Sequence, residues 1–290
     1  MNIVILGGTG FVGRYLNRLL TEHGNQVTAL GRQAFADGFD LTAQLNGQDL
    51  VINLVGENIG QRWSAAYKQA LIDSRVKTSE TLRIALQACS NPPKRIFAAS
   101  AIGIYPETDC QHPQDESFDV FAREDKSNFL TSLGQAWEQA NAQLTPTPVI
   151  MRFGVVLGKN GGALQKMLPP FKLGLGGPVA GGQQCFSWIH IHDLARAVAH
   201  LIEQPELEGV FNLTAPEPLS NDEFGRTLAK TLRRPYLIPL PLWQLKLMFG
   251  EGAKVLTYSS AVLPKRLLDS GFEFEFSRAH AALQNIVKSF

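Results

Sequence analysis

The sequence predicts an α/β protein built on a Rossmann-like, doubly wound parallel sheet with helices on both faces. Short apolar runs rich in β-branched residues alternate with longer segments that have helical periodicity. The first run also leads straight into a glycine-rich turn and a helical pattern. With 290 residues, we expect a Rossmann domain over residues 1–155 and a smaller C-terminal α/β substrate region over residues 156–290.

The first half of the chain contains the clearest alternation of strands and helices. Residues 2–6 are apolar almost throughout, which a strand buried on both faces requires. The further strands that we expect in this half cover residues 26–30, 49–55, 95–100 and 148–153. The expected helices cover residues 11–23, 64–89 and 130–144.

After Gly154, glycine and proline pairs interrupt this alternation. Strand character then returns at residues 186–191 and 209–213, with helical patterns over residues 194–203 and 220–232. Because strands occur in both halves, we expect the second region to be partly interleaved with the first.

Composition and charge restrict the possible partners. Lys plus Arg is 27 and Asp plus Glu is 26, so the net charge of +1 creates no global field for nucleic acid or an anionic bilayer. Any charged partner must therefore be met at a local site. No apolar run reaches the roughly 18 residues of a spanning helix. We expect a small-molecule substrate, no nucleic acid, no membrane, and a monomer or homodimer.

The three cysteines, Cys89, Cys110 and Cys185, lie far apart in the sequence. This spacing favours reduced thiols over a disulfide framework or a zinc site. No basic leader precedes the first strand, so we expect a cytoplasmic protein. His190, His192 and Asp193 lack a further ligand cluster and are interpreted as strand residues followed by a helix cap, so no metal is expected.

The turn Gly7-Gly8-Thr9-Gly10-Phe11-Val12-Gly13 lies between the first strand and the first helix. Glycines at this spacing permit a tight turn, close approach of a pyrophosphate, and close packing of helix on sheet. The helix N-terminus supplies N–H groups for the phosphates. We assign the whole segment, with Thr9, Phe11 and Val12, to a dinucleotide cofactor site.

The end of the second strand indicates which dinucleotide is bound. An acidic residue there suits the ribose 2′-hydroxyl of NAD, whereas an arginine suits the 2′-phosphate of NADP. This chain has Gly31 followed by Arg32. Arg32 as a solvated loop charge is the alternative, but the position favours NADP as the cofactor.

The glycine turn, Ser100, Tyr105 and the segment 188–193 (WIHIHD) together resemble the extended short-chain dehydrogenase/reductases, the nucleotide-sugar epimerase group. Further segments are similar to an atypical subgroup of epimerase-family proteins of uncertain substrate. They are 53–59 (NLVGENI), 62–63 (RW), 74–76 (SRV), 152–158 (RFGVVLG), 173–178 (LGLGGP), 212–216 (NLTAP) and 262–264 (VLP). The resemblance extends from residue 2 to about residue 285.

This resemblance implies roles for residues outside the glycine turn. Leu54 and Val55, followed by Gly56, would close the strand end beside the adenosine and ribose. Arg75 would reach the phosphates, with a helix-surface ion pair as the alternative. Asp40 would contact adenine unless it is an ordinary turn residue, and the backbone near Val155 would flank the nicotinamide.

The catalytic residues of the extended members are not all present. Those proteins use a Tyr-x-x-x-Lys pair and a Ser or Thr. Anchored on Glu138, the Tyr and Lys positions fall on Leu130 and Gly134, and the Ser/Thr position falls on Ala101, next to Ser100. We name Ser100 and Tyr105 as candidate catalytic residues; Tyr105 is otherwise a pocket wall.

A substrate pocket would use residues from both regions. The candidates are Asn58, Arg62, Trp63, Gln184 and Trp188. Arginine would pair with a phosphate or carboxylate, and tryptophan would stack on a base, unless these side chains only pack a lid.

Two functional hypotheses follow. One is an NADP-dependent epimerase or reductase that acts on a nucleotide-sugar-like or other small carbonyl or hydroxyl substrate. The other is an NADP-binding sensor or scaffold without ordinary turnover, because the Tyr-x-x-x-Lys pair is missing.

Overall fold

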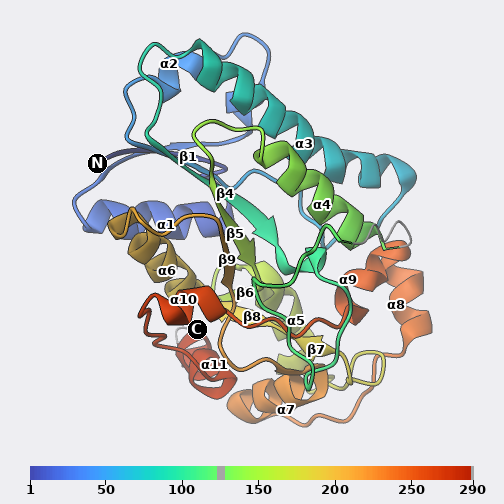
Figure 1. The fold of residues 1–290 in the computed structure, drawn as a ribbon. Helices are drawn as coiled ribbons and strands as arrows, with labels where there is room; N and C mark the ends of the chain where they lie inside the picture. The colour runs from blue at the N-terminus through green and yellow to red at the C-terminus, as the bar shows by residue number, and fades with distance from the viewer. Residues whose placement is uncertain (123–127, 289–290) are drawn as a thin grey trace.

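The computed structural model describes residues 1–122 and 128–288. Its centre is a six-stranded sheet in which every neighbouring pair of strands is parallel (Figure 1). The strands, in spatial order, are β2 (Gln26–Leu30), β1 (Asn2–Leu6), β3 (Leu50–Asn53), β4 (Arg95–Ala101), β5 (Val149–Phe153) and β9 (Val210–Leu213). The predicted Rossmann-like fold class is confirmed.

Helices cover both faces because alternate strand residues point to opposite sides. Ile3 and Ile5 pack in one apolar cluster with α1 (Phe11–Glu22) and α6 (Ile191–Glu203). Val4 and Leu6 pack on the other face with α2 (Leu41–Leu45) and α3 (Ala65–Ala88). Helix α4 (Phe129–Asn141) lies beside α3 (Figure 1).

The chain after residue 154 builds a second apolar cluster. Strand β6 (Val155–Gly158) pairs with β8 (Trp188–His190), and β7 (Cys185–Phe186) pairs with β10 (Leu219–Ser220). The remaining elements of this part are α5 (Gly162–Lys172), α7 (Asn221–Leu232), α8 (Leu242–Phe249), α9 (Lys254–Thr257), α10 (Lys265–Asp269) and α11 (Ala279–Lys288). Short 3₁₀ turns are η1 (Arg32–Phe35), η2 (Ile102–Ile104) and η3 (Glu251–Ala253).

The two predicted regions share the central sheet, because β9 comes from the second region and pairs with β5. Helix α6 also packs on α1. A boundary at residue 155 stays a prediction.

The expectation of three reduced cysteines is wrong. Cys110 and Cys185 form a disulfide, with their Cα atoms 5.2 Å apart, and Cys89 is free. The two residues are 75 positions apart in the sequence. They come together because the loop after η2, which contains Cys110, contacts the segment 258–261 beside β7. The Thr108 N–H, for example, donates to the Ser259 carbonyl. The spacing of the cysteines along the chain does not indicate that they lie close together. The disulfide also removes one argument for a cytoplasmic location.

The helix cap at the histidine motif also differs from the prediction. His190, not Asp193, caps α6, because the His190 ring accepts a hydrogen bond from the His192 N–H. Asp193 lies fully buried and accepts from the backbone N–H groups of Glu275 and Phe276. Within the described residues, no helix is both long and apolar enough to span a bilayer.

Candidate functional site

Three of the four glycines in the glycine turn, Gly7, Gly10 and Gly13, meet different constraints. Gly7 has φ of +79°, in the left-handed region, and a Cβ at Gly13 would lie 2.4 Å from the Gly7 carbonyl oxygen. A Cβ at Gly10 would have only that oxygen within 4 Å, at 3.2 Å. Gly7 and Gly13 therefore maintain the turn and the helix packing, whereas Gly10 leaves open space above the turn. A dinucleotide pyrophosphate needs that space.

A cavity of about 320 Å³ opens beside this turn, at the carboxyl ends of β1, β2 and β3. Strand β1 has β2 on one side and β3 on the other, so the strand order reverses here, where open α/β sheets bind ligands. Its lining includes eight of the predicted cofactor residues: Gly7, Thr9, Gly10, Gly31, Arg32, Leu54, Val55 and Gly56.

Four further residues of the lining were missed from the sequence: Phe35, Glu57, Ser74 and Thr78. Ser74 and Thr78 are four residues apart, so they share one face of α3. This spacing, beside Arg75, could have indicated from the sequence that Ser74 and Thr78 lie at the cofactor site. Phe35 lies on the short turn η1, which is too short to show a periodic pattern of apolar residues, so the sequence did not indicate that Phe35 lines the cavity.

Arg32 and Glu57 form an ion pair at the edge of the cavity. The Arg32 Nη2 donates to both carboxylate oxygens of Glu57, at 2.9 and 3.2 Å. The Arg32 side chain is 88% exposed. The backbone of Glu57 is held separately, because its N–H donates to the Ser74 hydroxyl and its carbonyl accepts from Arg75. Arg32 is therefore an exposed cation, and its present partner is a carboxylate.

Arg75 is buried rather than part of a helix-surface ion pair. Its guanidinium donates to the carbonyls of Leu71 and Glu57 and lies 4.8 Å from the centre of the Trp137 ring. Burial lowers the pKa of the guanidinium to about 10, although the Glu57 charge opposes this, so Arg75 stays charged at neutral pH. In this structure Arg75 holds the loop at Gly56 and Glu57 and is not part of the cavity lining.

The other predicted cofactor residues lie outside the cavity lining. Asp40 is the N-cap of α2, where its carboxylate accepts from the Ala43 N–H, as the turn alternative expects. Phe11, Val12 and Gly13 form the first turn of α1, and the Phe11 ring fills the space above Gly161. Val155 begins β6 directly after the carboxyl end of β5.

The positions of the absent Tyr and Lys are filled by apolar packing. Leu130 and Gly134 lie on α4 and face η2. A Cβ at Gly134 would lie 2.8 Å from the Ile104 Cβ, and one at Gly103 would lie 3.5 Å from the Leu130 Cβ. A lysine at position 134 would therefore collide with η2. The family's catalytic pair is missing, and so is the room for its lysine.

The catalytic candidates Ser100 and Tyr105 both lie in a buried polar network. The Ser100 hydroxyl donates to Glu138 at 2.6 Å, and Glu138 accepts from Arg152 through two bonds of 2.7 Å. The Tyr105 hydroxyl donates to Asn212 at 3.0 Å and accepts from Arg152 at 2.9 Å. The Tyr105 side chain has no exposed surface.

This burial argues against catalysis by either group, because a substrate would have to displace internal partners. Burial raises the pKa of Tyr105, although the Arg152 charge and hydrogen bond oppose it. Burial opposes the charge of Arg152, but Glu138 outweighs it and raises the pKa of the guanidinium. The network therefore keeps a charged Arg152 and a neutral phenol inside the protein.

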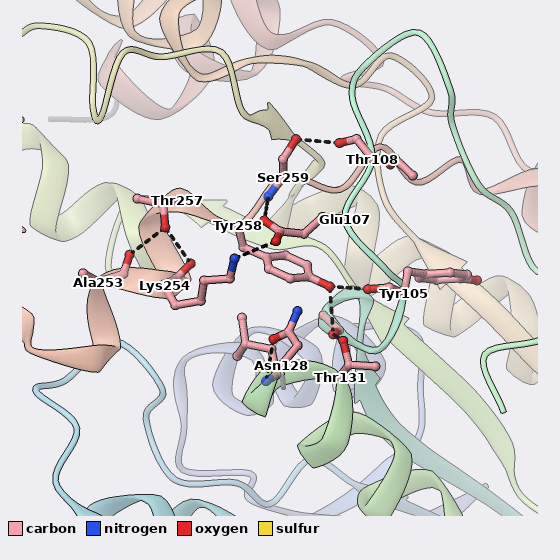
Figure 2. Close-up of polar contacts among 12 residues, drawn as sticks. Tyr105, Glu107, Thr108, Asn128, Thr131, Ala253, Lys254, Thr257, Tyr258 and Ser259 are labelled. Carbon is pink, nitrogen blue, oxygen red and sulfur yellow. Dashed lines mark hydrogen bonds and ion pairs between the residues drawn. The ribbon is translucent and has the colours of Figure 1, made fainter. Parts of the chain in front are cut away.

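A different tyrosine, which the sequence did not single out, lies beside the Leu130 position. Tyr258 packs against the apolar cluster that contains Leu130, and its hydroxyl donates to the backbone carbonyl of Tyr105. Figure 2 shows this hydroxyl pointing toward η2 and toward Thr131 of α4. Lys254, four residues earlier, lies 5.6 Å from the centre of the Tyr258 ring and donates to Glu107 at 2.6 Å. Distant sequence positions, 105, 131 and 258, meet here only through the tertiary fold.

The predicted substrate-pocket residues do not form one cleft. Trp188 has no exposed surface and packs in the second apolar cluster, so its assignment to a pocket is wrong. Trp63 is buried too, with its indole N–H donating to the Ile59 carbonyl and its ring edge-on to Phe129.

The polar candidates for that pocket are held by backbone contacts. Arg62 donates to the Leu247 carbonyl, Gln184 donates to the carbonyls of Val179 and Leu256, and the Asn58 side chain accepts from the Gly60 N–H. These contacts fit the lid-packing alternative. The sequence left lid packing and a substrate pocket both open, because residue type does not reveal which side of a segment faces inward.

Comparisons with known proteins agree with this geometry. Residues 3–214 match the model of the NAD dependent epimerase/dehydratase family, and residues 240–286 match a domain of unknown function, DUF1731. "Epimerase family protein SDR39U1" of Bos taurus is 37% identical over 300 residues, covering 99% of this chain and 100% of the relative.

Two solved structures extend the comparison. The crystal structure of the human epimerase family protein SDR39U1 with NADPH is 34% identical, with a TM-score of 0.89 over 100% of both chains. UDP-N-acetylglucosamine 4-epimerase from Methanobrevibacter ruminantium, in complex with UDP-N-acetylmuramic acid, has a TM-score of 0.71 over 99% of this chain and 97% of its own. Its identity of 19% supports the fold alone. The resemblance seen in the sequence is thus confirmed, and the chain belongs to the NAD dependent epimerase/dehydratase family.

Proposed function

We propose that this protein binds NADP(H) and acts as a reductase or epimerase on a small carbonyl or hydroxyl substrate of nucleotide-sugar type. The observation that carries the proposal is the cavity at the glycine turn, with Arg32 at its edge. A human relative that matches the chain from end to end has a crystal structure with NADPH.

The residues around the cavity fit this cofactor. The turn at Gly10 and the N–H groups at the start of α1 would hold the pyrophosphate. Backbone groups of Leu54 and Val55 would flank the adenosine ribose, and Arg32 would turn from Glu57 to the 2′-phosphate. When bound, NADPH supplies a hydride.

The remaining chemical requirement is a proton donor or acceptor on this chain. Ser100 and Tyr105 are enclosed in the buried network, whereas Tyr258 is only half-buried and lies beside η2. Its phenol would exchange the Tyr105 carbonyl for a substrate oxygen, with the Lys254 ammonium close to its ring. We therefore propose Tyr258, and no longer Tyr105, as the candidate acid or base.

The experiment incubates the purified protein and NADP(H) with UDP-, GDP- and dTDP-sugars. Nicotinamide absorbance reports reduction, and NMR reports inversion at the sugar. Tyr258→Phe should lower turnover by roughly 10²- to 10⁴-fold while NADPH affinity stays unchanged. Tyr105→Phe is the matched control and should leave turnover of the folded protein within a few-fold. Brisk turnover that neither variant affects would show that the catalytic groups lie elsewhere.

A second candidate function is an NADP(H)-binding sensor or scaffold. The packing of Ile104 against Gly134 favours it, because the fold has closed the space of the usual lysine. Tight NADPH binding without turnover of any sugar in the panel would support this function over the first.

A further inference from the structure

Exposed apolar side chains gather on two segments of the C-terminal region. Leu173 is 75% exposed, Leu237 77%, Trp243 65% and Leu247 69%. Single exposed leucines are ordinary, but a group of large apolar side chains indicates an interaction surface. We call this group the apolar edge, and its members are Leu173, Leu175, Leu237, Ile238, Trp243 and Leu247.

The two segments of the apolar edge are joined through their backbones. The Leu237 N–H donates to the Gly176 carbonyl at 2.9 Å, and the Leu240 N–H donates to the Pro178 carbonyl at 2.9 Å. Helix α8 follows at once, and Figure 1 places it at the outside of the molecule. Trp243 and Leu247 are one turn apart on its outer side, while Leu245 is fully buried.

Positive charge accompanies the apolar edge. No acidic residue occurs between Glu223 and Glu251, whereas Lys230, Arg233, Arg234 and Lys246 in that interval are all exposed. Across the described residues, no ion pair of these four is found. Two copies meeting through the edge would bring these like charges together. An anionic lipid surface would neutralise them.

We propose that the apolar edge docks this protein on anionic lipid surfaces. Trp243 and Leu247 would enter the headgroup boundary, and the arginine and lysine side chains would lie among the lipid phosphates. The net charge of +1 does not oppose this, because headgroups act on charges within about a Debye length of the surface. Residues 240–286 match a domain of unknown function, so this inference gives the beginning of that domain a role.

The test measures sedimentation of the full chain with vesicles of phosphatidylcholine, with and without phosphatidylglycerol. Binding is expected only with phosphatidylglycerol and should weaken as salt is added. The Trp243→Ser/Leu247→Ser variant should partition at least about tenfold more weakly, because it loses both inserted side chains. Arg234→Gln/Lys246→Gln should weaken binding at low salt. Leu268→Ser on α10 is the matched control, since Leu268 is exposed but outside the edge.

Four results would overturn the proposal. The first three are no binding to either vesicle, equal binding of the Trp243→Ser/Leu247→Ser variant, and equal binding to phosphatidylcholine alone. The fourth is a dimer in gel filtration that this variant abolishes, which would assign the edge to a second copy instead. Circular dichroism of each variant shows that it is folded. NADPH affinity reports the proposed function separately, so either idea can fail without the other.

Discussion

Replacement of Arg32 tests how the protein would distinguish NADPH from NADH. Arg32→Ala removes the cation at the edge of the cavity, where its guanidinium now pairs with Glu57 at 2.9 Å. A charge-assisted hydrogen bond to a 2′-phosphate contributes about 1.5–3 kcal/mol. The exposed pair with Glu57, which must break first, offsets about 0.2–1 kcal/mol of this. The net effect is about 0.5–2.8 kcal/mol, or a twofold to hundredfold loss of NADPH affinity.

Glu57 provides the opposite perturbation. Glu57→Gln removes the competing carboxylate charge but keeps the backbone bonds to Ser74 and Arg75, so NADPH affinity should rise by up to about fivefold. In the Arg32→Ala background the same substitution should have little effect, since the two residues act as one pair.

Isothermal titration calorimetry with NADPH and NADH measures both predictions. NADH affinity should stay unchanged in Arg32→Ala. Arg18→Ala is the matched control, because Arg18 forms a similar exposed pair with Glu22 on α1 and is not in the cavity lining. Equal wild-type affinities for NADPH and NADH, or an Arg32→Ala variant that keeps its NADPH affinity, would refute the assignment of Arg32.

Three further predictions concern the turn and the buried groups. Gly10→Val should abolish NADPH binding with an unchanged circular dichroism spectrum, because a branched side chain would block the pyrophosphate; retained affinity would place the phosphate site elsewhere. Glu138→Gln should lower the free energy of unfolding by about 3–5 kcal/mol in urea, since it leaves Arg152 buried without its carboxylate. The exposed pair at Glu80 is the control, and Glu80→Gln should cost less than about 1 kcal/mol. Burial lowers the pKa of His190 to about 4, so as the pH falls from 6.5 to 4 the unfolded chain binds the proton before the folded protein does. The free energy of unfolding therefore decreases as the pH falls, by about 2 kcal/mol between pH 7 and pH 5. His190→Asn should flatten that pH profile, and an unchanged slope would contradict the reasoning.

Much of the fold and of the cofactor site followed from local sequence patterns. The strand at 2–6 is apolar because both its faces are covered, and the turn at Gly7 to Gly13 needs glycine for its backbone angles and close contacts. The apolar run and the glycine spacing are patterns of a few consecutive residues, so they are visible in the sequence. The assignment of Leu54 and Val55 to the cofactor site came from the family resemblance instead, and both residues line the cavity.

The catalytic candidates depended on contacts between distant segments. Ser100 and Tyr105 follow a strand end, as catalytic groups often do, yet Glu138, Arg152 and Asn212 enclose them. No sequence pattern indicates that these five residues contact one another. Burial is a property of the assembled layers, and a polar residue type alone does not predict it.

The sequence by itself determined the parallel α/β architecture, the glycine turn and the absence of the usual Tyr-x-x-x-Lys pair. Only the tertiary structure decided that Trp188 belongs to the core, that Cys110 meets Cys185, and that Tyr258 lies beside the Leu130 position. The physical reason is the range of the interactions. Periodicity and turn geometry act over a few residues, whereas side-chain burial and pairing arise where segments 75 or more positions apart pack together.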